Sequence, residues 1–349
     1  NEEINLDRIS EDYYCKDGDL IFADASEDLN DVGKSIEIIN VNGEKLLSGL
    51  HTLLARPKSS IFHLGFNGYL FKSNSVRTQI QKESQGSKVL SINVGRISKI
   101  ELTFPTANEQ KKITALFGLL DERIQTQNKI LLHYQSLIKI LRNGIFRQKI
   151  RFKNAEGDNF SDWNIVELGS IAEKRNTKNK AMAIKTVLSN SATFGIMNQS
   201  DFFDKEIANP NNINGYYIVE KDDFVYNPRI SKEAPVGPIS RNKLGVGVMS
   251  PLYMVFRFKD IDIDYLENFF NSNTWFEYME NIANYGARAD RMSFSNVDFF
   301  KMPIPIPEIR EQKRIAVFLL KLEKKIQIEK AILEQLEIQK KYLLHQMFV

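Results

Sequence analysis

Glu109-Gln110-Lys111-Lys112-Ile113 recurs 202 positions later as Glu311-Gln312-Lys313-Arg314-Ile315. The flanking sequence follows in register, so that residues 97–146 align without a gap on residues 299–348. Solenoid repeats have much shorter periods, of roughly 20–50 residues. The chain therefore contains two domain-sized copies of one unit, and we expect both copies to perform the same kind of task.

Each copy continues into a long amphipathic pattern after a proline-containing junction, Phe104-Pro105 or Pro303-Ile304-Pro305-Ile306-Pro307. Apolar residues recur there in steps of three and four over about four heptads, which predicts two long helices with a/d packing stripes. Because the stripes have equal lengths, we expect the helices to pair with each other in antiparallel orientation. The expected packing residues are Leu120, Ile124, Leu131, Tyr134, Ile138, Leu141, Leu322, Ile326, Leu333, Leu336 and Leu343, with Gln127, Glu329 and Lys340 as polar members.

The regions between the helices indicate mixed α and β structure. Strand-like runs fall at residues 19–23, 50–54, 223–227 and 252–256, and shorter helical patterns follow at 66–82 and 264–281. We therefore predict an α+β fold with a pseudo-two-fold internal repeat, in which two α/β domains lie at opposite ends of two long antiparallel coiled-coil helices. The predicted segments are a first domain at 1–104, a first helix at 105–150, a second domain at 151–306 and a second helix at 307–349.

The two copies differ at their beginnings. The second copy has a lead-in from Trp163 to about Phe203 with no counterpart in the first, whereas Tyr216-Tyr217 aligns with Tyr13-Tyr14. We therefore expect the first domain to lack about forty residues of its front.

Composition restricts the class of protein. The single cysteine, Cys15, excludes an intramolecular disulfide and suits a reducing compartment. We find no signal-like start and no run of about 18 apolar residues, which predicts a cytoplasmic protein without membrane association. Residues 1–104 hold 12 Lys/Arg against 15 Asp/Glu, and residues 161–306 hold 16 against 18, so the basic character lies in the repeated helical segments.

Catalytic and metal-binding patterns are missing from the sequence. The four histidines are dispersed, and with one cysteine they form no metal-ligand spacing. Phosphate-binding loops and nucleophile motifs are also missing. The stretches Asn209-Pro210-Asn211-Asn212 and Asn227-Pro228-Arg229-Ile230 lack the second proline and the aromatic residue of an adenine-methyltransferase loop. We therefore predict that this chain is not an enzyme.

Polar, basic loops remain as candidates for recognition of nucleic acid, because Asn, Arg and Lys side chains pair with base edges and phosphates. Since the average charge of both globular regions is slightly acidic, phosphate contacts there require local basic patches. The candidate DNA-binding residues are Lys88, Arg175, Lys178, Lys180, Arg229, Lys232, Arg288 and Arg291.

The order of these features resembles the specificity subunit of type I restriction–modification systems. In that family each half ends in a proline-rich segment, Glu-Gln and a long helix, as in both copies here. The entry Arg151-Phe152-Lys153, Phe160-Ser161-Asp162-Trp163 and Leu168-Gly169 is similar to the start of a target-recognition domain of the family. Asp223-Phe224-Val225-Tyr226-Asn227-Pro228-Arg229 is similar to its recurrent central strand.

The resemblance implies two target-recognition domains that each read half of a bipartite site in double-stranded DNA, and a helical spacer that sets the gap. It also implies partners: two modification subunits that perform S-adenosylmethionine-dependent adenine-N6 methylation, and restriction subunits that complete the nuclease. No cofactor is expected on this chain itself. Two alternatives stay open at this point: a fragment of a fused methyltransferase–specificity enzyme, and a coiled-coil scaffold that binds only protein.

Overall fold

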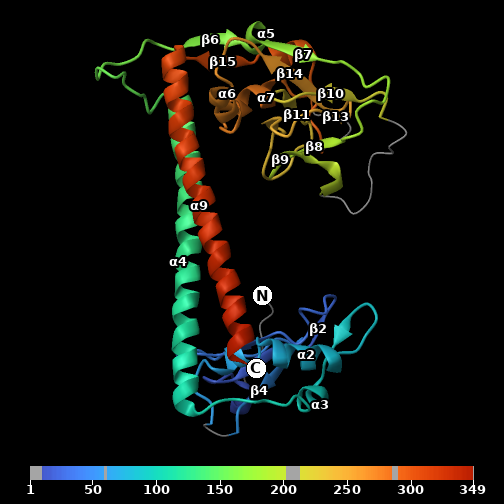
Figure 1. The fold of residues 1–349 in the computed structure, drawn as a ribbon, viewed down its shortest axis with the longest axis vertical. Coiled ribbons are helices and arrows are strands. Elements are labelled where there is room, and N and C mark those ends of the chain that lie inside the picture. Colours follow the sequence, from blue (N-terminus) through green and yellow to red (C-terminus); the bar gives the residue numbers. More distant parts are fainter. Residues whose placement is uncertain (1–9, 59–60, 202–212, 285–289, 349) are drawn as a thin grey trace. The chain divides into compact units, whose positions relative to one another are not determined.

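The computed structural model describes residues 10–58, 61–201, 213–284 and 290–348. The chain forms two compact units (Figure 1). Unit 1 combines Asn1–Leu131 with Ile328–Val349, and unit 2 is Leu132–Gln327. Each unit therefore contains a globular region and parts of both long helices, α4 (Ala107–Phe146) and α9 (Ile309–Met347). The division into four segments made from the sequence stays a prediction.

Unit 1 contains a small antiparallel sheet with the order β3-β1-β4. Its strands and a further two-stranded pair are β1 (Leu20–Ala23), β2 (Ala25–Ser26), β3 (Ser35–Glu37), β4 (Thr52–Ala55) and β5 (Leu90–Ser91). Its short helices are η2 (Glu11–Tyr13), α1 (Asn67–Leu70), α2 (Asn74–Glu83) and α3 (Val94–Ile97).

Unit 2 contains the related sheet β12-β11-β14-β7 and three two-stranded pairs, β10-β13, β15-β6 and β8-β9. The strands are β6 (Asn164–Glu167), β7 (Ala172–Arg175), β8 (Leu188–Ser191), β9 (Gly195–Asn198), β10 (Tyr217–Val219), β11 (Phe224–Tyr226), β12 (Ile239–Arg241), β13 (Gly247–Met249), β14 (Met254–Phe258) and β15 (Pro303–Ile306). The helices are α5 (Leu168–Ile171), η3 (Gln199–Asp201), α6 (Ile263–Phe270), α7 (Phe276–Ile282) and α8 (Asn296–Phe300).

The strand-like runs of the sequence correspond to β1, β4, β11 and β14, and β1 and β11 each lie between two antiparallel neighbours. The prediction of one helix at 66–82 and one at 264–281 was wrong, because each region forms two helices. In unit 1 the chain becomes extended at Ser73, whose hydroxyl caps α2 by accepting a hydrogen bond from the Val76 N–H. Such capping side chains favour a new helix start over a continuous helix.

The repeated Glu-Gln motif ties each long helix to its globular region. Gln110 donates to the carbonyl of Pro105 (2.9 Å) and accepts from the His63 N–H (2.8 Å). Gln312 donates to the carbonyl of Pro307 (2.8 Å) and accepts from the Asp262 N–H (3.1 Å). Both glutamines are buried, so these bonds satisfy polar groups that would be costly to leave unpaired.

Within each unit, α4 and α9 lie side by side in antiparallel orientation (Figure 1). In unit 1, Lys340 forms an ion pair with Asp121, and Gln127 donates to the carboxylate and the carbonyl of Glu329. In unit 2, Arg142 pairs with Glu323 at 2.8 Å. Gln127 and Glu329 occupy equivalent positions of the 202-residue repeat.

The residues of the predicted packing stripes are all buried or half-buried. Their polar members pair with one another or with Asp121 rather than facing solvent. In the described part of the chain, no helix combines the length and the apolar character that crossing a membrane requires.

Each core contains a phenyl ring from the end of the long helix that belongs to the other copy. Phe348, just after α9, lies in the core of unit 1, with ring centroids 5.6 Å from Phe66 and 6.2 Å from Phe117. Its equivalent Phe146, the last residue of α4, lies in the core of unit 2, 5.4 Å from Tyr265. The core of each unit therefore includes an aromatic side chain from the C-terminal end of the long helix that begins in the other unit.

We expect Phe146→Ala to lower the free energy of unfolding of unit 2 by about 3–5 kcal/mol, because it leaves a cavity among aromatic rings. Both tryptophans of the chain, Trp163 and Trp275, belong to unit 2, so urea unfolding followed by tryptophan fluorescence reports this unit. Phe348→Ala is the matched variant. It should lower the stability measured by circular dichroism and leave the unfolding transition measured by tryptophan fluorescence unchanged. A shift of the fluorescence transition in Phe348→Ala would contradict the assignment of Phe348 to the core of unit 1.

Candidate nucleic-acid interface

A hollow of about 250 Å³ opens on one side of unit 2 and is rich in aromatic side chains. Tyr217 of β10, Tyr253 before β14 and Phe294 line it, together with the polar groups of Lys174 and Asn296. Aromatic faces beside a cation and an amide are the groups that stack on bases and hydrogen-bond to their edges. The hollow therefore has the chemistry of a nucleotide contact.

A two-stranded ribbon forms one wall of this hollow. Its β-bridge joins Arg229 to Arg291, and the adjacent residues Pro228 and Met292 line the hollow. Because successive side chains of an extended chain point to opposite faces, the two arginines share the face away from the hollow. Two like charges directly opposite each other destabilise a β pair unless an anion neutralises them. This face is therefore suited to a phosphate.

The environment of Arg291 supports this interpretation. Its side chain is 23% exposed, and its Nε lies 3.6 Å from the carboxylate of Asp290, beyond hydrogen-bond distance. In the described part of the chain this buried Nε has no hydrogen-bond partner. Arg229 is exposed. Arg229 has no ion pair among the described residues, whereas the Asp290 carboxylate partly neutralises Arg291.

The other candidates from the sequence have different surroundings. Lys178 is exposed and lies beside the hollow, because its backbone forms a bridge with Tyr217. Arg175 instead pairs with Glu220 at 3.1 Å, inside a cluster that also contains Arg257. Lys180 and Lys232 of unit 2 and Lys88 of unit 1 are exposed, and no ion pair among the described residues engages them. Arg288 lies outside the described residues.

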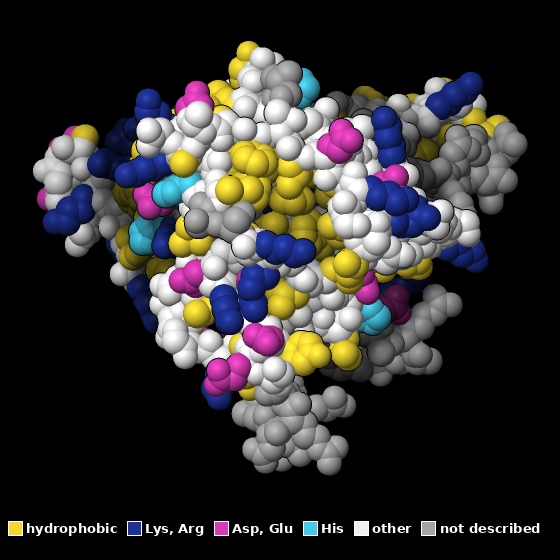
Figure 2. Space-filling model, turned by 90° about the horizontal axis from the view of Figure 1, so that it is seen from below, with side chains coloured by type: hydrophobic (Ala, Val, Ile, Leu, Met, Phe, Trp, Pro, Cys, Tyr) yellow, Lys and Arg dark blue, Asp and Glu magenta, His cyan; other side chains and the backbone are white. Residues whose placement is uncertain are grey.

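Unit 1 does not reproduce the arginine pair. The equivalent ribbon is β2 with β5, where Ala25 pairs with Ser91. On the face shown in Figure 2, Lys and Arg side chains are interspersed with Asp and Glu around a central group of hydrophobic side chains. This mixture gives no broad basic surface on that face. The two units therefore share a framework and differ at the positions that could contact DNA.

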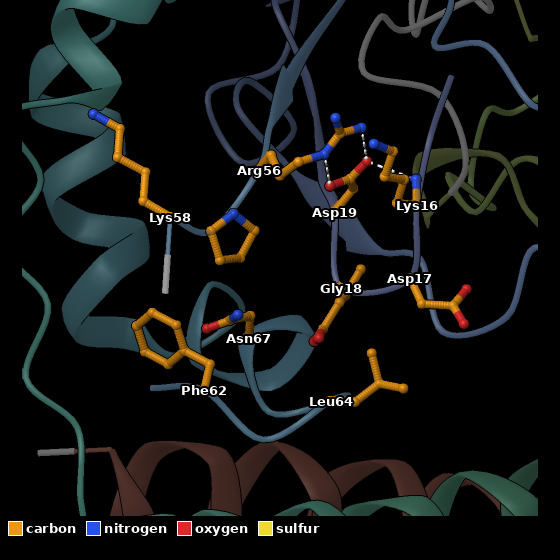
Figure 3. Close-up of a pocket in the computed structure, with 11 residues that line it drawn as sticks. Lys16, Asp17, Gly18, Asp19, Arg56, Lys58, Phe62, Leu64 and Asn67 are labelled. Atoms are coloured by element: carbon orange, nitrogen blue, oxygen red, sulfur yellow. Dashed lines mark hydrogen bonds and ion pairs between the residues drawn. The ribbon is translucent and has the colours of Figure 1, made fainter. Parts of the chain in front are cut away.

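Unit 1 has a larger hollow of about 570 Å³, lined by both acidic and basic side chains. Figure 3 shows Arg56 and Asp19 joined at one side of it, with Phe62 and Asn67 across the space. The carboxylate of Asp19 is 1% exposed, accepts from Nε and Nη2 of Arg56 at 2.8 Å each, and also accepts from the Lys16 N–H. Arg56 is therefore a structural partner of Asp19 and not a free cation.

The same Asp–Arg pair recurs in unit 2, and we call each of the two pairs an Asp–Arg clamp. Asp223 is fully buried and accepts from Nε of Arg257 at 2.7 Å and from the Glu220 N–H at 2.7 Å. Sequence reasoning missed both clamps. The available signal was an aspartate directly before an apolar strand in each copy, with an arginine near the end of the later of the two strands that pair with it.

The two aspartates differ in their pKa. For Asp19, burial raises the pKa, but hydrogen bonds from Arg56 and the Lys16 N–H outweigh burial and leave the pKa below its usual value. For Asp223, burial dominates and raises the pKa, although Arg257 and the Glu220 N–H oppose it. Arg257 also pairs with the carboxylate of Glu220 at 3.0 Å, so its charge is shared between two anions.

We expect Arg257→Met to lower the free energy of unfolding of unit 2 at neutral pH, because it leaves the buried Asp223 carboxylate without its cation. The loss should be limited to about 2 kcal/mol, because solvent screens Arg257, which is itself one-third exposed. A carboxyl with a raised folded-state pKa gains stability as pH falls through that pKa. The variant should therefore recover stability on acidification through the pKa of Asp223, and Asp223→Asn in the same chain should remove this recovery. Urea titrations followed by tryptophan fluorescence measure both effects; a pH-independent loss would contradict the role of Asp223.

Comparison with known proteins identifies a family and related folds. The sequence pattern described as the type I restriction modification DNA specificity domain matches residues 160–338. The chain is 25% identical over 347 residues to a Methanocaldococcus jannaschii protein assigned as the specificity subunit of the MjaX type I restriction enzyme. That match covers 94% of this chain and 77% of the relative.

Solved structures share the fold at low sequence identity. A chain from a type I restriction–modification complex matches with a TM-score of 0.58 and 15% identity, over 95% of this chain and 81% of its own length. The HsdS subunit of Thermoanaerobacter tengcongensis matches with a TM-score of 0.51 and 15% identity, over 99% and 85%. The S subunit of M. genitalium matches with a TM-score of 0.52 and 15% identity, over 97% and 85%.

The matched pattern covers more than half of the sequence, and the relatives agree with it along nearly the whole chain. An enzyme fragment and a protein-only scaffold, the two alternatives left open by the sequence, are not favoured by these findings. The chain belongs to the family of type I restriction–modification specificity subunits.

Proposed function

We propose that units 1 and 2 each read one half of a bipartite sequence in double-stranded DNA. The observation that carries this proposal is the combination of a repeated framework with diverged surfaces. Both units contain the Asp–Arg clamp and the glutamine junction, whereas Arg229 and Arg291 of unit 2 are replaced by Ala25 and Ser91 in unit 1. Two recognition units with the same fold and different contact residues would bind two different half-sites.

In this proposal, α4 and α9 form one antiparallel coiled coil with a recognition domain at each end. The 40 residues of α4 would span about 60 Å at 1.5 Å per residue. A DNA turn measures about 34 Å, so a rigid spacer of this length would admit only one gap between half-sites. The contact between the equivalent residues Gln127 and Glu329 supports the local two-fold axis that such a spacer requires.

The proposal assigns the chemistry to partner subunits. Two modification subunits would dock on the helical region, one on each of its equivalent halves, and restriction subunits would complete the complex in the cytoplasm. The modification subunits would bind S-adenosylmethionine and methylate adenine at N6, while this chain would bind no cofactor and perform no catalysis. Basic side chains of the helices would add to the sequence-independent attraction for phosphates.

We expect Arg229→Ala and Arg291→Ala each to weaken DNA binding by the complex of this chain with its modification subunits. If each arginine contacts a phosphate, the loss should be uniform across sequences and the slope of log affinity against log salt should fall by about one. Fluorescence anisotropy over a series of salt concentrations measures both quantities. Arg175→Ala removes the same charge from a residue paired with Glu220 and serves as the control; equal effects in all three variants would speak against the arginine ribbon.

Mapping of N6-methyladenine in DNA from cells that contain this chain and its partners tests the bipartite proposal itself. We expect one motif with two half-sites and a fixed gap. In the Arg229→Ala and Arg291→Ala variants, methylation should fall while both half-sites and the gap stay the same, because loss of a phosphate contact weakens binding uniformly across sequences. Scattered methylation, or a motif without two half-sites at a fixed gap, would refute the bipartite proposal.

A further inference from the structure

The aromatic hollow of unit 2 reaches below the surface of the protein. Its floor includes Tyr226, which is 1% exposed and whose hydroxyl donates to the carbonyl of Val236 at 2.9 Å. That hydroxyl is therefore occupied inside the fold, and Tyr226 offers its apolar ring to the hollow. Phe294 forms part of the wall and packs on Tyr226 and Phe299, at 5.3 and 5.5 Å between ring centroids. The aromatic surface is thus fixed by the core before any ligand binds.

The polar groups of this hollow have a defined hydrogen-bonding character. Lys174 of β7 and Asn296 of α8 are exposed, and in the described part of the chain neither side chain makes a hydrogen bond or an ion pair. Tyr217 and Tyr253 are half-buried and add two hydroxyl groups. An ammonium group can only donate, whereas an amide both donates and accepts. These groups suit a planar ring that carries carbonyl oxygens beside an N–H.

The bases of an intact duplex cannot enter a hollow of this kind. Paired bases show their edges at the floor of grooves roughly 8 Å deep, so a protein reaches them with a projecting helix, ribbon or side chain. A floor that lies below the protein surface is accessible only to a ring that has left the base stack. Enzymes that extrude a base hold it in the same way, by stacking on aromatic or apolar side chains and by hydrogen bonds to its pairing edge. The hollow is therefore suited to an unstacked base.

The methylation reaction supplies a base that has lost its partner. A methyltransferase turns its target base out of the duplex and into its own catalytic pocket, so adenine-N6 methylation leaves the opposite thymine unpaired. Extruding a base that is already unpaired costs less than breaking a base pair. Thymine carries two carbonyl oxygens beside one ring N–H, which is the pattern that an ammonium group and an amide can satisfy together.

We propose that the aromatic hollow of unit 2 holds the thymine that becomes unpaired when a modification subunit extrudes the adenine of the same half-site. The thymine stacks on the aromatic rings of the hollow. Lys174 donates to one of its carbonyl oxygens, and the amide of Asn296 pairs with its N–H and the other carbonyl. Because its partner is held outside the stack, the adenine cannot return to the duplex before methyl transfer. This inference rests on the proposed function and adds a role in holding the DNA open.

Photocrosslinking tests the position of the thymine. The complex of the full chain with its modification subunits is bound to a duplex with the mapped motif, in the presence of S-adenosylhomocysteine, which permits no methyl transfer. In two separate duplexes, 5-iododeoxyuridine replaces the thymine opposite one or the other methylated adenine, because its base forms a covalent bond with an aromatic ring on which it stacks. We expect one of the two duplexes to crosslink to Tyr217, Tyr253 or Phe294, as identified by mass spectrometry of the crosslinked peptide.

The affinity of variants tests the contribution of the hollow. Tyr253→Ala should weaken binding to the intact duplex by about tenfold, because a stacking partner is lost, and Lys174→Met should weaken it to a smaller extent. Neither variant should weaken binding to a duplex with an abasic site in place of this thymine, because the base that they contact is then missing. Lys243→Met is the control, since its ammonium group is paired with Glu267 at 2.6 Å, and it should leave the affinity for both duplexes unchanged.

The outcomes separate this inference from the proposed function. Urea unfolding followed by tryptophan fluorescence shows whether Tyr253→Ala is folded, and Lys174→Met replaces an exposed side chain in the case that it is not. If anisotropy shows that the duplex is bound, the absence of a crosslink, a crosslink to other residues, or equal losses on the intact and abasic duplexes would overturn the thymine site alone. A complex that recognises no bipartite motif would overturn the proposed function and this inference with it.

Discussion

The antiparallel pairing of α4 and α9 is the constraint on which both units depend. Each core needs the start of one long helix and the end of the other, and Phe146 and Phe348 are the side chains that complete this exchange. Removing either helix would therefore expose apolar surface in both units, since a core of this size cannot close over a missing aromatic ring at low cost. Gln127 and Glu329 specify the register of the pairing, because a shift by one turn would leave both buried polar groups without a partner.

Buried charges in this protein hold elements together rather than form a reactive site. Asp19, Asp223 and Glu311 are buried carboxylates, and each meets an arginine from a distant part of the chain. A buried charge without its partner costs several kcal/mol, so such pairs specify the arrangement more strongly than they add to stability. The arginines in these pairs are neutralised inside the fold. Cations on the loops, such as Arg229, are the ones left for contact with an anion.

The candidate surface could be predicted from the sequence only in part. Loops rich in Arg, Lys and Asn stood out by composition, and the structure brings Arg229 next to Arg291 although 62 residues separate them in the sequence. It also shows that Arg175 is neutralised by Glu220, which no sequence pattern indicated. The Asp–Arg clamps escaped notice because their members lie 37 and 34 residues apart, on strands whose pairing is a tertiary property. The break of the predicted shorter helix in unit 1 arose from local capping, for which Ser73 was the visible signal.

The sequence by itself determined the 202-residue repeat, the two long helices and the related strands on which the two units are built, because these follow from periodicity and from the order of apolar and turn residues. Its resemblance to a specificity subunit rested on the same features. Only the tertiary structure decided which polar residues neutralise one another and which aromatic ring completes each core. The physical reason is that these properties depend on contacts between residues far apart in the chain, and such contacts exist only once the antiparallel helices have brought the segments together.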